Sequence, residues 1–418
     1  MIQARHDAAR TPVAGDRQPL LDVETARATM LAAVTPPTVE GAQWRSHAEA
    51  LRRVLAADQS ATLTMPRWRN SAMDGYAVRH AEAEAAGPAG LAIDQAVPAG
   101  TEPAPLAAAS AARIFTGAPI PDGADTVVMQ EHCRRDGERV IVERVPERGA
   151  NIRAAGEDFR AGDLLLRSGQ HLGPQHVALA ASAGHAELPV HRRPRVAVLV
   201  TGDELVAPGE ALGDGQIHES NGRLLTALVA GLGAEACVPV MVPDDARHTR
   251  EALLTAAAEA DLVLTSGGVS VGDADHVRAA AQAVGTLEFF GVAVKPGKPL
   301  AFGRIGRTPL LSLPGNPVSL FVTFVLFGAP LLRRLQGRAT VLPAPLPVAA
   351  DFEQQRTRPR ADYLRVRLEH GRLQPHPDQG SGILGSLAAA DGLACVPPDT
   401  RVAPGDRLDY YPMAALLA

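Results

Sequence analysis

Lysine is almost absent from this chain. Only two of its 41 basic residues are lysines, Lys295 and Lys298, and they lie three positions apart. Lysine carries a compact, mobile point charge and arginine a rigid planar fork, so the two are not interchangeable. Two ammonium groups in one loop braced by proline and glycine predict a site for an oxyanion such as phosphate. The alternative is chance, because an arginine-rich chain can also leave two lysines close together.

Other common signatures are missing as well. The three cysteines, at positions 133, 237 and 395, lie far apart without a CxxC pair, which indicates a reducing cytoplasm and no zinc site. The chain has no Walker loop, no GxGxxG after a strand and no Ser-His-Asp signature. Residues 1–19 have no apolar core, so we expect a mobile extension rather than a secretory signal. A net charge of -5 argues against nucleic acid as a partner.

One long uncharged run superficially resembles a membrane span. It covers residues 311–332, but Pro314, Gly315, Asn316 and Pro317 interrupt it. Since proline breaks a helix interior, the remainder predicts a buried helix of ordinary length from about Val318, and no membrane partner.

The first half of the chain is expected to be discontinuous. At 418 residues the chain should hold three or four domains. Residues 23–58 have apolar residues at helical spacing with a break at 35–37, which predicts two helices. Residues 66–156 instead show short strands and proline turns. We therefore predict an elongated helical domain made of 20–65 and 157–194, with a β-rich insertion at 66–156.

The second half has an α/β texture. Apolar runs alternate with helical segments across residues 195–340, which predicts a doubly wound, mostly parallel sheet. Residues 341–418 alternate strands with proline-rich turns and predict a small all-β domain. The fold class is therefore a multidomain α/β protein.

Three polar or glycine-rich loops follow strands of the predicted sheet. They cover residues 201–205, 265–275 and 314–319, and an apolar strand at 289–294 leads to the lysines. Parallel strands bring such loops to one edge, where ligands bind, although each loop alone could be an ordinary turn. The candidate binding residues in them are Thr201, Gly202, Ser266, Gly267, Gly268, Ser270, Gly272, Pro314, Gly315, Asn316, Pro317 and Ser319.

Acidic residues in two of these loops are candidate metal ligands. Taken singly, Asp273 and Asp275 are more typical of helix caps. Together with Glu204 they could supply oxygens to Mg²⁺, which usually takes one or two carboxylates plus phosphate and water. A glycine cradle for an anion, acids for a metal and lysines for a leaving phosphate predict phosphoryl or oxyanion chemistry.

Eight segments, in order, resemble the molybdopterin molybdenumtransferase family, whose eukaryotic counterpart is the E domain of gephyrin. A single such string is weak, whereas eight in sequence are specific. They are residues 70–77, 113–119, 151–158, 201–205, 213–217, 266–272, 295–299 and 314–319.

The resemblance implies a four-domain homodimer that inserts molybdate into the dithiolene of adenylated molybdopterin, with Mg²⁺-dependent release of AMP. It also suggests the adenylyltransferase of the preceding step and molybdoenzyme chaperones as partners. In the dimer, Asp74 and Thr116 should reach the partner's cleft, and Arg360 and Ser381 should contact molybdate or another anion. The implied catalytic residues are Asp158, Glu204, Asp244, Asp275, Lys295 and Lys298.

Two alternatives share this fold. Molybdopterin adenylyltransferases typically have Ser/Thr-Gly-Gly-Thr-Gly in the glycine loop, whereas Val269-Ser270-Val271-Gly272 follows the glycines here. A non-catalytic scaffold would be expected to lose the acids or the lysines, and all are present. The chain also departs from the family at Trp68-Arg69 and at His218, although Asn221 carries over.

Overall fold

The computed structural model describes residues 20–268, 276–356 and 359–418. It divides into two compact units, one formed by the chain up to residue 41 with residues 191–418, the other by residues 42–190. The finer division predicted from the sequence, with boundaries at 65/66, 156/157, 194/195 and 340/341, stays a prediction.

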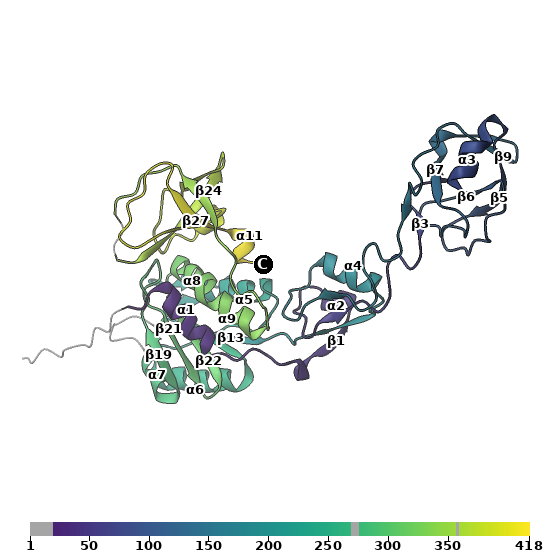
Figure 1. The fold of residues 1–418 in the computed structure, drawn as a ribbon. Helices are drawn as coiled ribbons and strands as arrows, with labels where there is room; N and C mark the ends of the chain where they lie inside the picture. The colour runs from purple at the N-terminus through teal and green to yellow at the C-terminus, as the bar shows by residue number, and fades with distance from the viewer. Residues whose placement is uncertain (1–19, 269–275, 357–358) are drawn as a thin grey trace, which may run out of the picture. The chain divides into compact units, whose positions relative to one another are not determined.

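A seven-stranded sheet forms the centre of the first unit (Figure 1). β13, β16, β17, β18 and β22 run parallel, and β21 and β19 continue the sheet antiparallel. This arrangement confirms the mostly parallel sheet. In order, the strands are β16 (Glu235–Ala236), β13 (Arg195–Thr201), β18 (Leu262–Ser266), β22 (Thr308–Leu313), β21 (Ala301–Ile305) and β19 (Thr286–Phe290), with β17 (Val240–Val242) also paired to β13.

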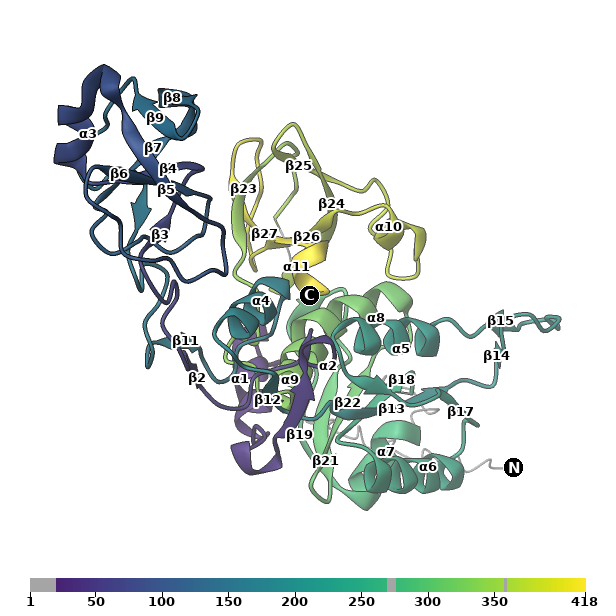
Figure 2. The ribbon, with the colours of Figure 1, turned by 90° about the vertical axis from the view of Figure 1, so that its right-hand side faces the viewer.

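Helices cover both faces of this sheet (Figures 1 and 2). Along β13, Val196, Val198 and Val200 face one apolar core, while Ala197 and Leu199 face the other. This explains the unbroken apolar run, because the strand is buried on both sides. The first face carries α1 (Val23–Ala32), α5 (Asn221–Gly231), α8 (Pro317–Thr323) and α9 (Ala329–Leu335), and the second carries α6 (Ala246–Glu259) and α7 (His276–Val284).

The uncharged run forms the central helix of the first face. A π-helical turn at Phe324–Gly328 joins α8 to α9, so the segment Pro317–Leu335 is helical throughout. It is long and apolar enough to cross a membrane, but 89% of its most apolar stretch is buried within the structure. Its burial confirms the expectation of a core helix.

The C-terminal residues form a closed β-barrel, because β24 pairs with both β25 and β26. The lysine segment supplies one of its strands, which corrects the predicted strand at 289–294. β19 ends at Phe290, since Gly291 has φ +83°, and only Val294–Lys295 is extended again. The strands are β20 (Val294–Lys295), β24 (Ala361–Glu369), β25 (Arg372–Pro375), β23 (Leu346–Ala350), β27 (Arg407–Pro412) and β26 (Gly392–Val396).

The second unit contains a six-stranded sheet built from the β-rich segment. Its cores include Ile114 and Val127. In order, its strands are β7 (Thr126–Met129), β4 (Gly75–Val78), β6 (Ser110–Ile114), β5 (Leu91–Val97), β9 (Arg139–Val142) and β8 (Cys133–Asp136).

The prediction of two helices over residues 23–58 is half wrong. α1 forms, but the second half contains a 3-10 turn (Val39–Gly41), β1 (Gln43–Ser46) and the four-residue α2 (His47–Ala50). β1 pairs antiparallel with β12 (Glu187–Val190), over 140 residues along the chain. This distant pairing overrides the local helical spacing.

The remaining elements are short. They are β2 (Gln59–Ser60), β3 (Asn70–Ser71), α3 (His80–Ala86), two 3-10 turns (Gly87–Ala89 and Gln130–His132), β10 (Ile152–Arg153), β11 (Leu164–Leu166), α4 (Pro174–Ser182), β14 (Leu205–Val206), β15 (Ile217–His218), α10 (Gly385–Ala388) and α11 (Met413–Leu416).

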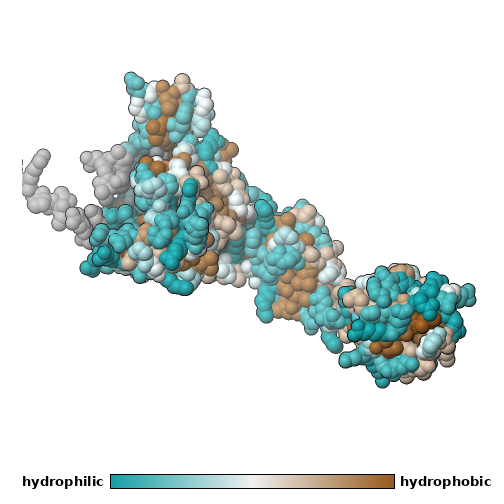
Figure 3. Space-filling view, turned by 90° about the horizontal axis from the view of Figure 1, so that it is seen from above, coloured by the Kyte–Doolittle hydropathy of each residue, from teal (hydrophilic) through white to brown (hydrophobic). Residues whose placement is uncertain are grey.

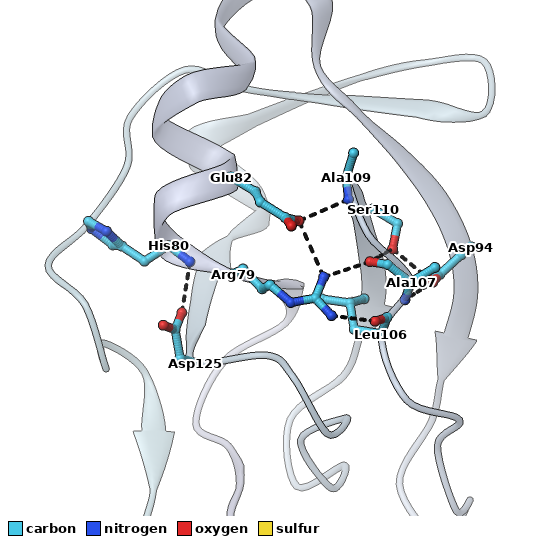
Figure 4. Close-up of polar contacts among 9 residues, drawn as sticks. All are labelled: Arg79, His80, Glu82, Asp94, Leu106, Ala107, Ala109, Ser110 and Asp125. Atoms are coloured by element: carbon cyan, nitrogen blue, oxygen red, sulfur yellow. Dashed lines mark hydrogen bonds and ion pairs between the residues drawn. The ribbon is translucent and has the colours of Figure 1, made fainter.

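Arg79 ties the chain before β6 to α3 (Figure 4). Its guanidinium donates to the backbone oxygens of Leu106 (2.5 Å) and Ala107 (2.7 Å) and pairs with Glu82 at 3.3 Å. Glu82 in turn accepts from the backbone N–H of Ala109 at 3.0 Å. One side chain therefore fixes the conformation of a segment that has no regular structure of its own.

Replacing Arg79 with methionine should lower the free energy of unfolding of the second unit by about 1–3 kcal/mol, because it leaves two carbonyls without their donor. Urea denaturation followed by circular dichroism measures the change. Arg135→Met is the matched control, since Arg135 is exposed and donates only to Gly137 among the described residues. Equal effects of the two substitutions would contradict this role of Arg79.

Candidate functional site

A pocket of about 770 Å³ lies in the first unit, where β13, β18 and β22 end. This is the edge at which open α/β sheets bind ligands. The residues that line it are Val200, Thr201, Gly202, Glu204, Leu205, Ile217, His218, Glu219, Ser220, Asn221, Asp244, Ser266, Gly267, Gly268, Pro299, Pro314, Gly315, Asn316, Pro317, Ser319 and Gly382.

The structure brings all three predicted loops to this pocket. Of the candidate binding residues, Thr201, Gly202, Ser266, Gly267, Gly268, Pro314, Gly315, Asn316, Pro317 and Ser319 line it. The predicted residues Ser270, Gly272, Asp273 and Asp275 lie outside the described residues.

Asn221 connects the three walls of the pocket. Its side-chain amide donates to the hydroxyl of Ser266 (2.9 Å), the last residue of β18, and to the backbone oxygen of Gly315 (2.6 Å) after β22. Asn221 itself is the first residue of α5. The resemblance carried Asn221 over but showed none of its contacts, because the partners 45 and 94 positions away become its neighbours only in the folded sheet.

Two glycines let the loop after β18 close over Thr201. At Gly267, with φ +91°, a Cβ would stand 2.7 Å from the backbone oxygen of Thr201. At Gly268, with φ +62°, it would stand 2.5 Å from Cγ2 of Val277. Both positions therefore require glycine, for reasons of backbone conformation and of space. This geometry favours a loop shaped for ligand binding over an ordinary glycine-rich turn.

Glu204 and Asp244 place two carboxylates in the pocket wall. Asp203 lies beside them and accepts the backbone N–H of Asp244 at 3.1 Å. Burial, and next the charge of Asp203, raise the pKa of Asp244 above its ordinary 3.8, and Glu204 adds to this effect. Among the described residues no three His, Cys, Asp or Glu side chains lie close enough to hold a metal ion.

The raised pKa makes ionised Asp244 unfavourable in the folded apo protein at neutral pH. Asp244→Asn should therefore raise the Tm at pH 7. The gain should shrink as the pH falls through the folded-state pKa toward 3.8, since wild-type Asp244 is then neutral as well. Calorimetric scans at pH 7 and pH 4 measure both values.

The neighbouring Asp245 supplies a control of opposite sign. Its side chain caps α6, and its hydrogen bond with His248 lowers its pKa to about 2. Asp245→Asn should lower the Tm at pH 7 and have less effect as the pH falls toward 2. Substitutions that shift the Tm in the same direction at both positions would contradict the electrostatic assignment.

Neither lysine is among the residues that line the pocket. Lys295 forms an ion pair with Asp362 of β24 at 2.7 Å, and both lysines are exposed. The loop is fixed from the other side as well, because Gly297 (φ +120°) packs so closely on Thr323 of α8 that a Cβ would overlap its methyl group. Pro299, one residue beyond Lys298, reaches the pocket wall.

The C-terminal barrel also contributes to the pocket. Gly382 lines it, and the preceding Ser381 accepts a hydrogen bond from the backbone N–H of Val318 in α8 at 3.1 Å. Ser381, a predicted anion contact, is therefore adjacent to the wall. The other predicted contact of this domain, Arg360, is half-buried and is not among the residues of the wall.

Three predicted residues belong to the second unit. Asp74 and Thr116 contact each other, since Asp74 accepts from the backbone N–H (2.7 Å) and the hydroxyl (2.8 Å) of Thr116. The first of these bonds is the main cause of the lowered pKa of Asp74. Asp158 is exposed and donates its backbone N–H to Met65 at 3.1 Å. The pairing of Asp74 with Thr116 joins two segments that the resemblance had named separately.

Three family models match consecutive parts of the chain. The MoeA N-terminal region (domain I and II) matches residues 21–184, a probable molybdopterin binding domain matches 197–334, and the MoeA C-terminal region (domain IV) matches 347–413. The pocket residues from the sheet loops fall within the second of these, and Gly382 within the third.

Curated relatives match most of the chain. Molybdopterin molybdenumtransferase of Haemophilus influenzae is 39% identical over 76% of this chain and 78% of its own length. The Nostoc enzyme of that name is 39% identical over 82% of each chain. The crystal structure of the molybdopterin biosynthesis moeA protein from Pyrococcus horikoshii OT3 matches 94% of this chain and 100% of its own, with 29% identity and a TM-score of 0.80. The chain belongs to the MoeA family of molybdopterin molybdenumtransferases.

Proposed function

We propose that this protein inserts molybdate into the dithiolene of adenylated molybdopterin and releases AMP in a Mg²⁺-dependent reaction. The pocket at the ends of β13, β18 and β22 is the observation that carries the proposal, because it gathers a glycine loop and two carboxylates at one sheet edge. Its volume of about 770 Å³ lies within the usual range of ligand pockets.

The chemistry of the wall fits a phosphate-bearing ligand and its metal. The glycines at 267 and 268 bring backbone close to the pocket, and α5 begins at its wall, so both favour an anion. Glu204 and Asp244 would hold Mg²⁺, since a divalent cation would offset both the burial of Asp244 and its repulsion by Asp203 and Glu204, which together raise its pKa. Bound there, the metal would neutralise charge on the pyrophosphate as AMP leaves.

We assign the remaining anion contacts to the lysine loop and the C-terminal barrel. Lys295 and Lys298 are exposed in the loop that reaches the pocket wall at Pro299, and their ammonium groups would neutralise phosphate or molybdate oxygens. Ser381 adjoins the wall through Val318, and Arg360 supplies a further guanidinium in the same barrel. The acids Asp273 and Asp275 complete the proposed metal set, and Ser270 and Gly272 the glycine loop.

The protein is proposed to act as a cytoplasmic homodimer. On the second unit, apolar residues gather in a patch over the part that carries α2 and α4 (Figure 3). Trp44 of β1, in the same unit, is 57% exposed, and large exposed apolar residues favour a protein interface. In such a dimer Asp74, Thr116 and Asp158 would serve the partner's pocket. The adenylyltransferase of the preceding step and molybdoenzyme chaperones are proposed as further partners.

Molybdate-dependent release of AMP tests the function. The purified protein is incubated with adenylated molybdopterin and Mg²⁺, with and without molybdate, and AMP is quantified by chromatography. AMP should appear with molybdate and disappear when EDTA removes the metal. The adenylyltransferase alternative predicts instead that the protein consumes ATP and molybdopterin to form the adenylated compound, and a scaffold would do neither.

A further inference from the structure

Strand β24 of the C-terminal barrel carries two buried charges. Asp362 is 5% exposed and Arg365 is 1% exposed, which makes Arg365 one of the largest fully buried side chains. Burying a charge is costly unless partners hold it. Burial indeed lowers the pKa of Arg365, with Asp362 and Asp378 opposing the shift. The cost of burying this guanidinium must therefore be offset by its hydrogen bonds.

The hydrogen-bond partners of the Arg365 side chain, among the described residues, all come from one loop. Its side chain donates to the hydroxyl of Ser386 (3.1 Å) and to the backbone oxygens of Gly380 (3.1 Å) and Asp378 (3.3 Å). Its backbone exchanges two further bonds with the side-chain amide of Gln379, at 3.1 and 2.9 Å. Within the described part of the chain no carboxylate forms an ion pair with this guanidinium, so its charge is stabilised by hydrogen bonds to the carbonyl oxygens of the loop. Arg365 is therefore the centre about which residues 378–386 fold.

This loop is the part of the barrel that reaches the pocket. Between the two carbonyls that Arg365 holds and Ser386 lie Ser381, which is bonded to Val318 of α8, and Gly382, which lines the wall. The loop has only a four-residue helix, α10, to support it. Its position at the pocket therefore depends on the contacts of Arg365 and on the backbone bond between Ser381 and Val318 rather than on a sheet ladder.

The other buried charge of the same strand faces the lysine. One oxygen of Asp362 accepts from the ammonium of Lys295 at 2.7 Å, and β20 runs parallel to β24 with Lys295 opposite Asp362. The Lys295 side chain is 52% exposed, against 6% for that of Asp362. A fixed carboxylate occupies one ammonium hydrogen and leaves the other two for an anion.

We propose that β24 aligns the pocket, with Arg365 as the positioning residue of the 378–386 loop and Asp362 as that of Lys295. The catalytic meaning of this alignment rests on the proposed function. Neither residue lines the pocket, so each acts through a group that does or that lies beside it.

Arg365→Met is the first test, with Arg367→Met as the matched control. Arg367 lies on the same strand but is exposed and donates only to Ala389 among the described residues. Hydrogen exchange followed by mass spectrometry needs no substrate. Arg365→Met should speed exchange in the 378–386 loop and at Val318 by about tenfold or more and leave β13 and β18 unchanged, whereas Arg367→Met should alter neither region.

The kinetic readout separates positioning from general damage. Arg365→Met should raise the KM for molybdate or the adenylated pterin about tenfold, with a smaller change in kcat. If Arg365→Met does not fold, Ser386→Ala removes one of the three side-chain contacts and should show the same effects at smaller size. Unchanged loop exchange, or exchange accelerated across the whole unit, would overturn the role of Arg365. An inactive wild type with protected loops would instead count against the proposed function alone.

A double-mutant cycle tests the second residue. Asp362→Asn should lower kcat/KM about fivefold to tenfold in the wild type but less than twofold in a Lys295→Met background, because its target is then gone. Glu288→Gln, which breaks an exposed ion pair with Arg304 of the same unit, is the control and should change neither background. Equal losses from Asp362→Asn in both backgrounds would show that Asp362 does not act through Lys295.

Discussion

Glutamine in place of Glu204 is expected to reduce AMP release about 100-fold while the protein stays folded. Glu204 lines the pocket close enough to Asp244 to contribute to its raised pKa, so the two carboxylates form the acidic side of the proposed metal site. The amide keeps the shape but removes one of the charges that Mg²⁺ requires. Initial rates of AMP release over a Mg²⁺ series should show a weaker apparent affinity for the metal as well as a lower maximum.

Glu210→Gln controls for the loss of an acid as such. Glu210 is exposed, follows β14 and does not belong to the pocket wall. Its replacement should leave the rate within twofold of the wild type at every Mg²⁺ concentration. If Glu204→Gln behaved like this control, the acidic side of the pocket would have no part in the reaction.

Alanine at Gly267 is expected to lower the free energy of unfolding by about 2–4 kcal/mol and to abolish turnover. The backbone there has φ +91°, which alanine rarely adopts, and the new Cβ would stand 2.7 Å from the backbone oxygen of Thr201. The loop after β18 would have to move away from β13, and the pocket would lose the part of its wall formed by Gly267 and Gly268. Urea denaturation and the AMP assay measure the two effects.

Gly231→Ala separates this strain from the general cost of replacing glycine. Gly231 ends α5, and a Cβ there would meet no atom within 4 Å. Alanine in a helix is favoured over glycine by roughly 0.5–1 kcal/mol, so this variant should be as stable as the wild type or more so. A Gly267→Ala protein of wild-type stability would contradict the close approach seen at Thr201.

The parts of the fold that local sequence determines were predictable. β13 and β18 show as continuous apolar runs because both of their faces are buried, and the helix from Pro317 begins where the prolines allow it. The loops at their ends could be placed at one edge from the parallel arrangement alone. For this reason ten of the candidate binding residues named from the sequence line the pocket.

The parts of the fold and of the site that depend on residues far apart in the sequence could not be predicted. The bonds of Asn221 and the ion pair of Lys295 with Asp362 join positions 45 to 94 residues apart. No periodicity encodes such contacts, and the segment Val294–Lys295 pairs with β24 of the barrel rather than with the sheet that precedes it. Similarly, β1 forms only because β12 pairs with it. The anion site at the lysine pair therefore stays a prediction, and the sequence did not reveal that Asp362 is the carboxylate paired with Lys295.

A single-turnover experiment tests the central claim most directly. Enzyme in excess is mixed with a limiting amount of adenylated molybdopterin, molybdate and Mg²⁺, and both AMP and pterin-bound molybdenum are quantified over time. We predict that the two products appear together in a one-to-one ratio and that neither forms with Glu204→Gln on the same timescale. Release of AMP without molybdenum bound to the pterin, or no release by the folded wild-type protein, would contradict the assignment.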